Sequence, residues 1–439
     1  MTEDTVFALA SAPGRAGIAV IRLSGGAAGD ALSALGCALP PPRKAMRAVF
    51  QDPASGARLD DGLLIWFPGP NSFTGEDVAE LHVHGGRAVI DSILGALNGI
   101  AGLRPAEPGE FSRRAFEHDK MDLTQAEALA DLIDAETRAQ QTQALRQMGG
   151  ALKELYDDWR LRLVQALAHL EAVIDFPDED LPPEVADNVW EEIADLQKEI
   201  EAHLNDNGRG ERIRGGISVA IIGPPNAGKS SLLNVLVKRD AAIVSDMPGT
   251  TRDVIDVHLD LGGYAVLIAD TAGLREAGDA IEDEGIKRAR RRAEQADLKI
   301  AVFDGAAYPA RDEATLAMID ANTISVINKS DLLQAPEPPD TEIRISAKTG
   351  AGMDALLAQL EQRVEAMSDT GCSVPLTRVR HRRALQECSD ALQRSLTAEL
   401  PELAAEDLRL AGRALGCITG RVDVEEILDV VFREFCIGK

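Results

Sequence analysis

Hydrophobic and polar positions follow two different periods in the first part of the chain. Short apolar runs bounded by Gly or Pro occur at 17–23, 62–67 and 78–83, which is typical of strands. Residues 87–97 instead have the spacing of a helix. The pattern therefore predicts a mixed α+β unit over residues 1–118.

From Met121 onward the period becomes that of helices. Thr124 and Glu127 stand three residues apart at the start of an apolar stripe, as in a capping box. A longer stripe follows at helical spacing, and its members are Leu152, Leu155, Trp159, Leu163, Leu167, Leu170 and Ile174. This spacing is more typical of a bundle core than of a cofactor site. A break at 175–183, an acidic helix to about residue 204 and a polar linker at 205–212 come next.

Residues 213–368 have a third pattern, in which short β-branched runs each end in a polar motif. The runs are 217–222, 264–270, 323–327 and 343–345. A polar break at 368–375 leads back to helical spacing as far as Phe435. The prediction is a multidomain α/β plus all-α protein, with an α+β domain over 1–118, a helical bundle over 119–212 plus 369–439, and an inserted domain over 213–368.

The first of these runs is followed by Gly223-x-x-x-x-Gly228-Lys229-Ser230 and then by a helical pattern. The two glycines let the backbone bend around a phosphate chain, so that successive N–H groups point inward. The helix presents its positive dipole end to the same charge. The lysine can reach the β/γ oxygens, and the serine hydroxyl can ligate Mg²⁺. The order strand, loop, helix indicates a phosphate site, although the loop alone is also compatible with a solvated glycine turn.

Three more motifs follow, each at a predicted strand end. Asp270 suits an indirect contact to Mg²⁺, and Gly273 can offer its N–H to a γ-phosphate. Asp331 can accept both N1–H and N2–H₂ of guanine, a donor pair that adenine lacks. Four motifs in this order indicate a Ras-like P-loop GTPase that binds GTP and Mg²⁺. The motifs predict contacts from Ala227, Gly228, Lys229, Ser230, Ser231, Thr251, Asp270, Thr271, Ala272, Gly273, Asn328, Lys329, Asp331, Ser346, Ala347 and Lys348.

The segment 246–253 lies between a helix and a strand, where a switch loop belongs. Thr251 is its natural second hydroxyl ligand for Mg²⁺. Leu274 stands where many regulatory GTPases have a water-positioning Gln, and a leucine cannot orient water. Catalysis must therefore use another residue, and Arg275 and the nearby acids are the candidates. On spacing alone, a solvated charge of a mobile switch remains the better explanation for any one acid.

Composition limits the function classes. Hydrophobic residues make up 45% of the chain, enough for globular cores, although aromatics are only 4%. No apolar run approaches the roughly 18 residues of a membrane span, and the N-terminus lacks a basic region, so we expect a cytoplasmic protein. Five widely spaced cysteines indicate reduced thiols. A formal net charge of −26 repels phosphate backbones, so nucleic acid must be contacted through local basic patches or a partner.

Three features leave alternatives open. His82 and His84 share one strand face, but no third ligand stands at suitable spacing, so hydrogen-bonded strand histidines are favoured over a metal site. Cys436, near the terminal lysine, can have raised thiolate character, and an incidental thiol is equally consistent. The polar segment 108–116 is explained equally well by an ordinary loop that enters a helix as by a functional motif.

Motifs in all three predicted domains resemble the family of tRNA modification GTPases called MnmE or TrmE. They are GRAGIAVIR (14–22), NSFTGED (71–77), HGG (84–86), PGEFS (108–112), DKMDL (119–123), GTTRD (249–253), DTAGLR (270–275) and the terminal CIGK. The resemblance implies an N-terminal folate-binding domain that forms a homodimer, and GTPase domains activated by K⁺-dependent dimerisation. With the FAD-containing partner MnmG (GidA), in a heterotetramer or larger complex, the family installs a carboxymethylaminomethyl or aminomethyl group at C5 of the wobble uridine of tRNAs. The tRNA would be held mostly through the partner.

The resemblance also implies roles for particular residues. Contacts to a 5-formyl-tetrahydrofolate-like cofactor would come from Arg22, Glu80, Lys120 and Lys439. Cys436 would be functionally important, and Glu282 matches the family's water-orienting acid. A K⁺ ion beside the nucleotide would be held by Asn226, Ser245, Met247 and Thr250. Two departures are the sequence Met247-Pro248 in the switch and a somewhat short GTPase unit after Asp304.

A competing class is a regulatory GTPase of ribosome assembly, resembling Era or Der, without modification chemistry. Those proteins share the Asn226-type loop and the missing Gln. They are less favoured because the sequence shows no KH-like RNA domain and no second GTPase repeat, while the N-terminal motifs and Cys436 are present. A P-loop kinase or ATPase is more distant still, and it is excluded if the motif Asn328–Asp331 reads guanine.

Overall fold

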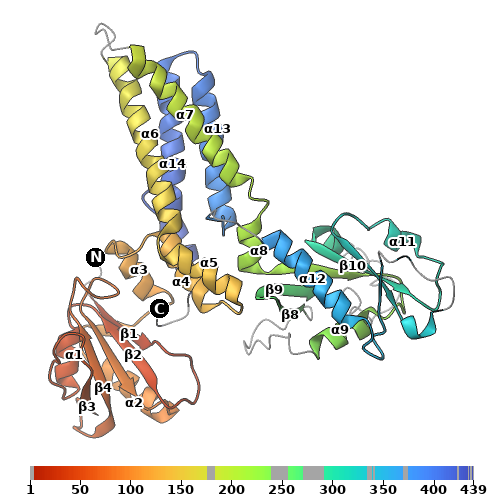
Figure 1. Cartoon of the computed structure of the whole chain (residues 1–439). Helices are drawn as coiled ribbons and strands as arrows, with labels where there is room; N and C mark the ends of the chain where they lie inside the picture. Colours follow the sequence, from red (N-terminus) through yellow and green to blue (C-terminus); the bar gives the residue numbers. More distant parts are fainter. Residues whose placement is uncertain are drawn as a thin grey trace, which may run out of the picture. The chain divides into compact units, whose positions relative to one another are not determined.

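The computed structural model describes residues 4–175, 183–238, 256–269, 291–333, 339, 342–368, 374–422, 425–433, 435 and 438. The chain divides into two compact units (Figure 1), each described separately below. The first comprises Met1–Ala130, Gln147–Glu192 and Arg394–Lys439, and the second comprises Asp131–Arg146 and Ile193–Gln393. This division cuts through four helices and does not follow the ranges 1–118, 119–212 plus 369–439, and 213–368. Those domain ranges stay a prediction.

The first unit contains a six-stranded sheet of order β3-β4-β5-β2-β1-β6. Its strands are β1 (Thr5–Leu9), β2 (Ala19–Ser24), β3 (Met46–Gln51), β4 (Arg58–Phe67), β5 (Val78–Val83) and β6 (Leu103–Pro105). All neighbours are antiparallel except β1 and β6, which run parallel. The predicted strand at 78–83 is confirmed with the same bounds, while β1, β3 and β6 were not predicted.

One face of this sheet is covered by α1 (Ala28–Ala34) and α2 (Arg87–Asn98). Ile21, Leu23, Leu64 and Leu81 are completely buried in that layer. On the other face, α3 (Glu110–Glu117) places Phe111 in a small cluster over β1. The strands therefore alternate between a fully buried side and a side that is only partly covered.

The remainder of the first unit is helical. Its elements include α4 (Leu123–Ile133), α6 (Ala151–Asp175), α14 (Pro401–Thr419) and α15 (Glu425–Arg433). Ion pairs join Arg409 to Glu171 and Arg421 to Asp157, so α6 and α14 run antiparallel. The apolar stripe predicted for the long helix is buried at Leu152, Trp159 and Leu163, as expected of a helical core. Among the described helices, none is long and apolar enough to cross a membrane.

The cap of α4 differs from the prediction. Thr124 and Glu127 are both buried, and the reciprocal bonds come from other residues. Asp122 accepts the backbone N–H of Gln125 at 2.9 Å, and the Gln125 side chain accepts the backbone N–H of Asp122 at 3.1 Å. The capping box is thus two residues earlier than the expected one, because an aspartate caps as well as a threonine does.

The second unit is built on a six-stranded sheet of order β12-β11-β10-β7-β9-β8. Its strands are β7 (Ile217–Ile222), β8 (Asp256–Leu261), β9 (Tyr264–Ala269), β10 (Leu298–Asp304), β11 (Thr323–Asn328) and β12 (Ile343–Arg344). All pairs are parallel except β8 with β9. The four strands predicted between 217 and 345 are confirmed within one residue at each end.

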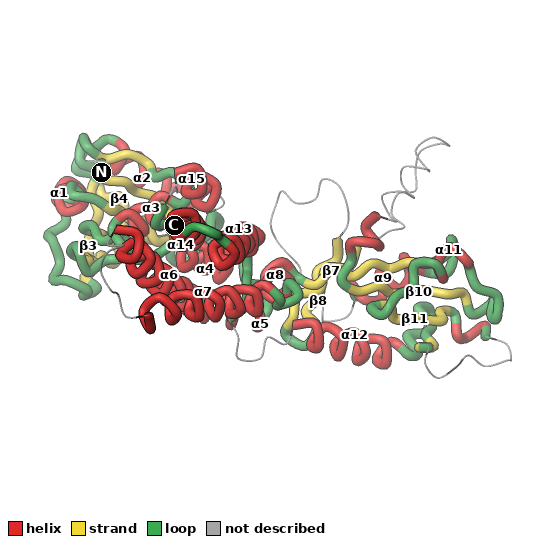
Figure 2. The backbone as a smooth tube through the Cα atoms, turned by 90° about the horizontal axis from the view of Figure 1, so that it is seen from above, coloured by secondary structure: helices red, strands yellow, loops and turns green. Residues whose placement is uncertain are grey.

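Helices cover both faces of this second sheet. One core contains side chains of α9 (Lys229–Val237) and α12 (Met353–Ser368), packed on Val219, Ile221 and Val302. The other face buries Ile222 and Phe303 against Ala293 and Met318. Figure 2 shows strands and helices alternating along this unit, whose other short elements are α11 (Glu313–Leu316) and the 3₁₀ turn Ser330–Leu332. The expected doubly covered, Ras-like α/β architecture is confirmed.

Helical segments of the second unit attach to this α/β core. The supposed linker at 205–212 is wrong in part, because α8 (Arg209–Gly215) begins inside it and leads directly into β7. Arg382 of α13 (Val379–Thr397) bonds Glu211 and Asp206, and these bonds hold the start of α8 against α13. The second half of α7 (Pro183–Leu204) meets α13 through a 2.7 Å hydrogen bond between Gln197 and Gln393. The polar sequence of α8 reflects ion pairing, which periodicity does not reveal.

Candidate nucleotide-binding site

The predicted phosphate loop follows β7, at the point where the order of the strands reverses. β7 lies between β9 and β10. After β7 the chain forms β8 and β9 on one side of it and then crosses to the other side, where it forms β10, β11 and β12. Crevices form at the carboxyl ends of strands at such a reversal, and ligands of open α/β sheets bind there. The topology therefore places residues 223–230 where a nucleotide site is expected.

The loop itself needs residues that tolerate left-handed backbone. Gly223 has φ +152°, and a Cβ there would lie 2.3 Å from the carbonyl oxygen of Val302. Gly228 has φ +93°, and a Cβ there would lie 2.2 Å from the side-chain nitrogen of Asn328. Asn226 also has positive φ, at +65°, a conformation that asparagine adopts more readily than most residues. Both glycines are therefore required by neighbours as well as by the turn.

Lys229 is held at the concave side of the loop. Its Nζ donates to the carbonyl oxygens of Gly223 at 2.8 Å and Pro224 at 2.9 Å. Ser230 and Ser231 occupy the first turn of α9 and are exposed. An ammonium group, a helix N-terminus and a hydroxyl thus converge at one end of α9, which is the set of groups that binds a phosphate chain with its Mg²⁺.

Asn328 connects this loop to the base-reading motifs. Its side chain is 2% exposed, and its Nδ2 donates to the carbonyl oxygen of Ala227 at 2.9 Å. Its Oδ1 accepts the backbone N–H of Ala347 at 3.0 Å. The motif at 328–331 and the motif at 346–348, predicted separately, therefore lie together and against the phosphate loop. Asn328 therefore joins the two loops through hydrogen bonds of its side chain.

Asp331 is prepared to accept hydrogen bonds. The hydroxyl of Ser346 donates to its Oδ1 at 2.7 Å. This hydrogen bond lowers the pKa of the Asp331 carboxyl by more than burial raises it, so the side chain is ionised at neutral pH. Lys329 has left-handed φ, and its Nζ lies 2.7 Å from Asp304 Oδ2. Lys348 is exposed at the same edge.

Many predicted residues lie outside the described part of the chain. They are Ser245, Met247, Thr250, Thr251, Asp270, Thr271, Ala272, Gly273, Arg275, Glu282, Cys436 and Lys439. The structure thus brings together the phosphate loop and the two base motifs, and the switch residues and the C-terminal pair stay predictions.

A second group of predicted residues lies on the sheet of the first unit. Arg22 of β2 stands directly opposite Glu80 of β5 and bonds its Oε1 through Nε at 3.2 Å and a terminal nitrogen at 2.9 Å. The same guanidinium lies 5.4 Å from the ring centre of Phe73 and 5.8 Å from that of Phe111. Arg22 and Glu80 are each about one-fifth exposed, at 19% and 18% of the side chain. The pair is accessible yet held in place.

Lys120 and the chain end belong to the same unit. Lys120 is exposed, and its Cε would lie 3.3 Å from a Cβ at Gly75. Gly438 has φ +100°, and a Cβ there would lie 2.1 Å from the carbonyl oxygen of Leu9. Leu9 is paired with Ile21, the neighbour of Arg22. Gly438 therefore lies against the end of β1, the strand next to β2, which carries Arg22.

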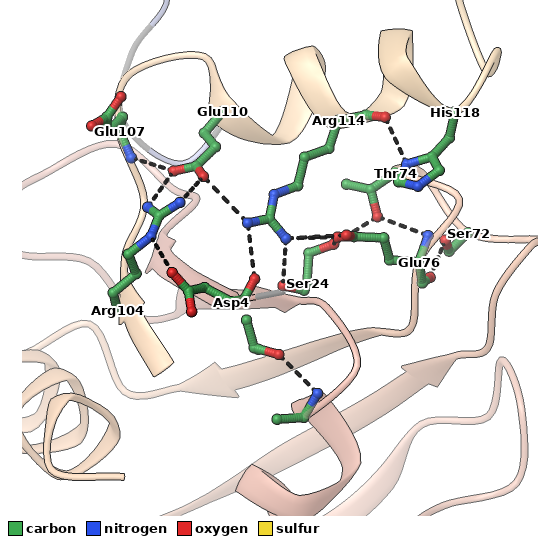
Figure 3. A network of polar contacts seen from close by, with 12 residues as sticks. Asp4, Ser24, Ser72, Thr74, Glu76, Arg104, Glu107, Glu110, Arg114 and His118 are labelled. Atoms are coloured by element: carbon green, nitrogen blue, oxygen red, sulfur yellow. Dashed lines mark hydrogen bonds and ion pairs between the residues drawn. The ribbon is translucent and has the colours of Figure 1, made fainter. Parts of the chain in front are cut away.

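A buried polar network that the sequence did not reveal fixes the loop that carries Phe73 (Figure 3). Arg114 of α3 is 3% exposed and bonds Glu76, Glu110 and the carbonyl oxygen of Ser24. The Ser24 and Thr74 hydroxyls lie 2.6 Å apart. Thr74 and Glu76 are thus bonded to β2 and α3 directly after Phe73, whose ring lies against Arg22. The pair Arg113-Arg114 was the sequence signal, but spacing could not show which arginine is buried.

The two histidines, His82 in β5 and His84 just after it, have different surroundings. His84 is hydrogen-bonded as expected, with its backbone N–H and its Nδ1 each 2.8 Å from the Asp60 carboxylate, but it does not belong to the strand, because β5 ends at Val83. Burial raises the pKa of Asp60, but the hydrogen bonds with His84 lower it by a larger amount, so the net shift is downward. His82 instead lies beside Glu80, with 3.4 Å between Nε2 and Oε2. Among the described residues, no three metal-binding side chains gather.

The sheet order, the phosphate loop and the paired base motifs define a P-loop GTPase. Comparison with known proteins extends this class to the whole chain. The family model for the MnmE helical domain matches residues 123–436, and that for the N-terminus of the GTP-binding protein TrmE matches residues 5–120. The chain therefore belongs to the MnmE (TrmE) family.

Similar curated proteins extend over the same length. The tRNA modification GTPase MnmE of Paramagnetospirillum magneticum is 58% identical, with 100% of both chains covered. That of Parvibaculum lavamentivorans is 57% identical over 99% of this chain and 100% of its own. A mitochondrial 5-taurinomethyluridine-[tRNA] synthase subunit, GTPB3, of Rattus norvegicus is 47% identical over 99% of this chain and 93% of its own.

Proposed function

We propose that this GTPase acts in modification of the wobble uridine of tRNA, where it helps to install a carboxymethylaminomethyl or aminomethyl group at C5. The observation that carries the proposal is similarity along the full chain to proteins named tRNA modification GTPases. The match of residues 5–120 to the TrmE N-terminus favours this proposal over the Era- or Der-like alternative.

In the nucleotide site, each group has a defined task. Asp331 selects guanine by accepting its two N–H groups, and Lys229 neutralises the β- and γ-phosphate oxygens. Ser230 and Thr251 would hold Mg²⁺, with Asp270 contacting it through water. The exposed hydroxyl of Ser230, in the first turn of α9, fits that task.

Hydrolysis needs charge neutralisation and an oriented water. Asn226, with Ser245, Met247 and Thr250, would hold K⁺. Its left-handed, exposed place on the phosphate loop fits a ligand that faces the nucleotide. A cation there supplies positive charge between the β- and γ-phosphates. Glu282 would orient the attacking water, and Arg275 is the further catalytic candidate.

The sheet of the first unit would bind the one-carbon donor, 5-formyl-tetrahydrofolate or a related folate. The ion pair Arg22–Glu80, bordered by aromatic rings, fits a planar ring with N–H donors at its edge. Lys120 and Lys439 would add positive charge, which suits the carboxylates of a folate. The partly covered sheet face also fits homodimerisation, and the chain end that contacts β1 would bring Cys436 to the donor.

The partner MnmG would supply the FAD chemistry and most of the tRNA contact. The net charge of −26 supports this division, because such a chain repels a polyanion except at local basic patches. A heterotetramer or larger complex in the cytoplasm is the expected working form.

Reconstitution tests the proposal directly. Full-length chain, MnmG, GTP, a tetrahydrofolate donor and unmodified tRNA should yield C5-modified wobble uridine in K⁺ buffer, as measured by mass spectrometry of nucleosides. Omission of this chain or of GTP should abolish the product. Product formation without this chain would contradict the proposed function.

The same reaction mixture tests the proposed K⁺ site independently of the modification reaction. GTP hydrolysis should be faster in K⁺ than in Na⁺, and equal rates would refute only the cation site at Asn226.

Glu282→Ala should slow turnover and leave nucleotide affinity nearly unchanged. A loss of nucleotide binding by that variant would show that the acid is structural.

A further inference from the structure

His82 stands on the partly covered face of the first sheet, directly beside the Arg22–Glu80 pair. In the strand register, His82 faces Val20 of β2 and Leu63 of β4, while Glu80 faces Arg22 and Ile65. These side chains share one face because residues opposite each other in neighbouring strands point the same way. Leu63 is 45% exposed, and the side chain of His82 is 27% exposed. An apolar border thus surrounds the polar pair.

Among the described residues, hydrogen bonds reach one oxygen of the Glu80 carboxylate. Oε1 receives two N–H groups from Arg22, at 3.2 and 2.9 Å. Oε2 lies 3.4 Å from His82 Nε2, and that buried nitrogen has no hydrogen-bond partner among the described residues. A bare nitrogen lone pair facing a carboxylate oxygen would be repulsive, whereas an Nε2–H group is attracted to it. The geometry therefore favours the form of His82 with a proton on Nε2.

We propose that His82 is a positioning residue that holds Glu80 Oε2, so that the carboxylate presents its free lone pairs to the N–H donors of a folate-type ring. This inference rests on the proposed folate binding. A small movement closes the 3.4 Å gap to a hydrogen bond, and the carboxylate then cannot rotate about its last torsion. A fixed acceptor pays less ordering entropy when a ligand binds.

Loss of the His82 side chain should weaken the binding of folate to the full-length chain. Titration with 5-formyl-tetrahydrofolate should show binding about tenfold weaker for His82→Leu, because one charge-assisted hydrogen bond is worth roughly this factor. His82→Gln should stay within about threefold of wild type, because its amide N–H can reach the same oxygen. Leucine and glutamine have similar bulk, so packing alone would not separate these two variants.

A double-mutant cycle tests whether His82 acts through Glu80. In the Glu80→Gln background, His82→Leu should have no further effect on folate affinity, because the acceptor charge is already removed. His169→Leu, at an exposed position of α6, is the matched control and should leave folate affinity unchanged. GTP affinity and the thermal midpoint, measured on every variant, show whether the fold is intact.

The outcomes distinguish this inference from the proposal beneath it. A wild-type chain that binds no folate would refute the folate proposal and this inference together. Folate binding by wild type with the same affinity in His82→Leu would overturn the inference alone. Equal losses in His82→Leu and His82→Gln, persisting in the Glu80→Gln background, would also overturn it, because His82 would then act through packing.

Discussion

At the scale of residues, base selection depends on one carboxylate and the groups that prepare it. Asp331 receives the Ser346 hydroxyl at 2.7 Å, and Asn328 fixes the loop that carries Ser346 to the phosphate loop through Ala347 and Ala227. Because the acceptor is fixed and ionised before a nucleotide arrives, we expect a preference for guanine that comes from complementary charge and not from shape.

Asp331→Asn should therefore change the preferred base. The amide offers a donor where the carboxylate offers an acceptor, so affinity for GTP should fall at least about 100-fold and affinity for xanthosine triphosphate should rise. Titration with both nucleotides measures this. Asp320→Asn, which removes a carboxylate paired with Lys299 on the same domain, is the control and should keep the guanine preference. An unchanged preference in Asp331→Asn would show that another group reads the base.

The sequence predicted these chemical groups better than their connections. Motif order identified the glycine loop and Asp331, because phosphate and guanine chemistry demand particular residue types. It could not show that Asn328 joins two loops or that Arg114 is buried, since both depend on contacts between distant segments. The capping box was placed at Thr124 because hydroxyls are common caps, while the structure uses Asp122.

At the scale of elements, buried runs were predictable and short or ion-paired elements were not. The strands at 217–222 and 78–83 were predicted with the observed bounds, since their apolar periods are clear. β3 was missed because five of its six residues are exposed or only partly buried. α8 was read as a linker because its polar residues are fixed by Arg382, which the local sequence cannot indicate.

The end of α7 gives a prediction about pH. Burial lowers the pKa of His203 to about 4, and Arg382 and His381 lower it as well, while Asp206 acts in the opposite direction. Between pH 6.5 and 4 the unfolded chain binds the proton and the folded chain does not, so stability falls as pH falls. Over that range the loss from this group is on the order of 3 kcal/mol.

Hydrogen exchange of the second half of α7, corrected for intrinsic rates, measures this loss. The free energy of local opening should decrease more steeply toward pH 4 in wild type than in His203→Gln. His169→Gln, on the exposed face of α6, should behave as wild type. Parallel slopes for wild type and His203→Gln would mean that His203 is protonated in the folded chain.

At the scale of the whole molecule, the chain has two candidate sites in separate compact units. The candidate nucleotide site belongs to the unit with the mainly parallel sheet, and the Arg22–Glu80 pair belongs to the unit with the mainly antiparallel one. The sequence indicated both, the first through physical motifs and the second only through resemblance. This difference arises because a phosphate loop has a local pattern, whereas a site on a sheet face is assembled from strands far apart in the chain.

Mass spectrometry of wobble uridines, in tRNA from cells that lack this protein, is the most direct test of the proposed modification function. The C5 aminomethyl-type groups should be lost, and they should be restored by the intact chain and not by Cys436→Ser. Unchanged uridines together with a defect in ribosome assembly would contradict it and would favour a regulatory GTPase without modification chemistry.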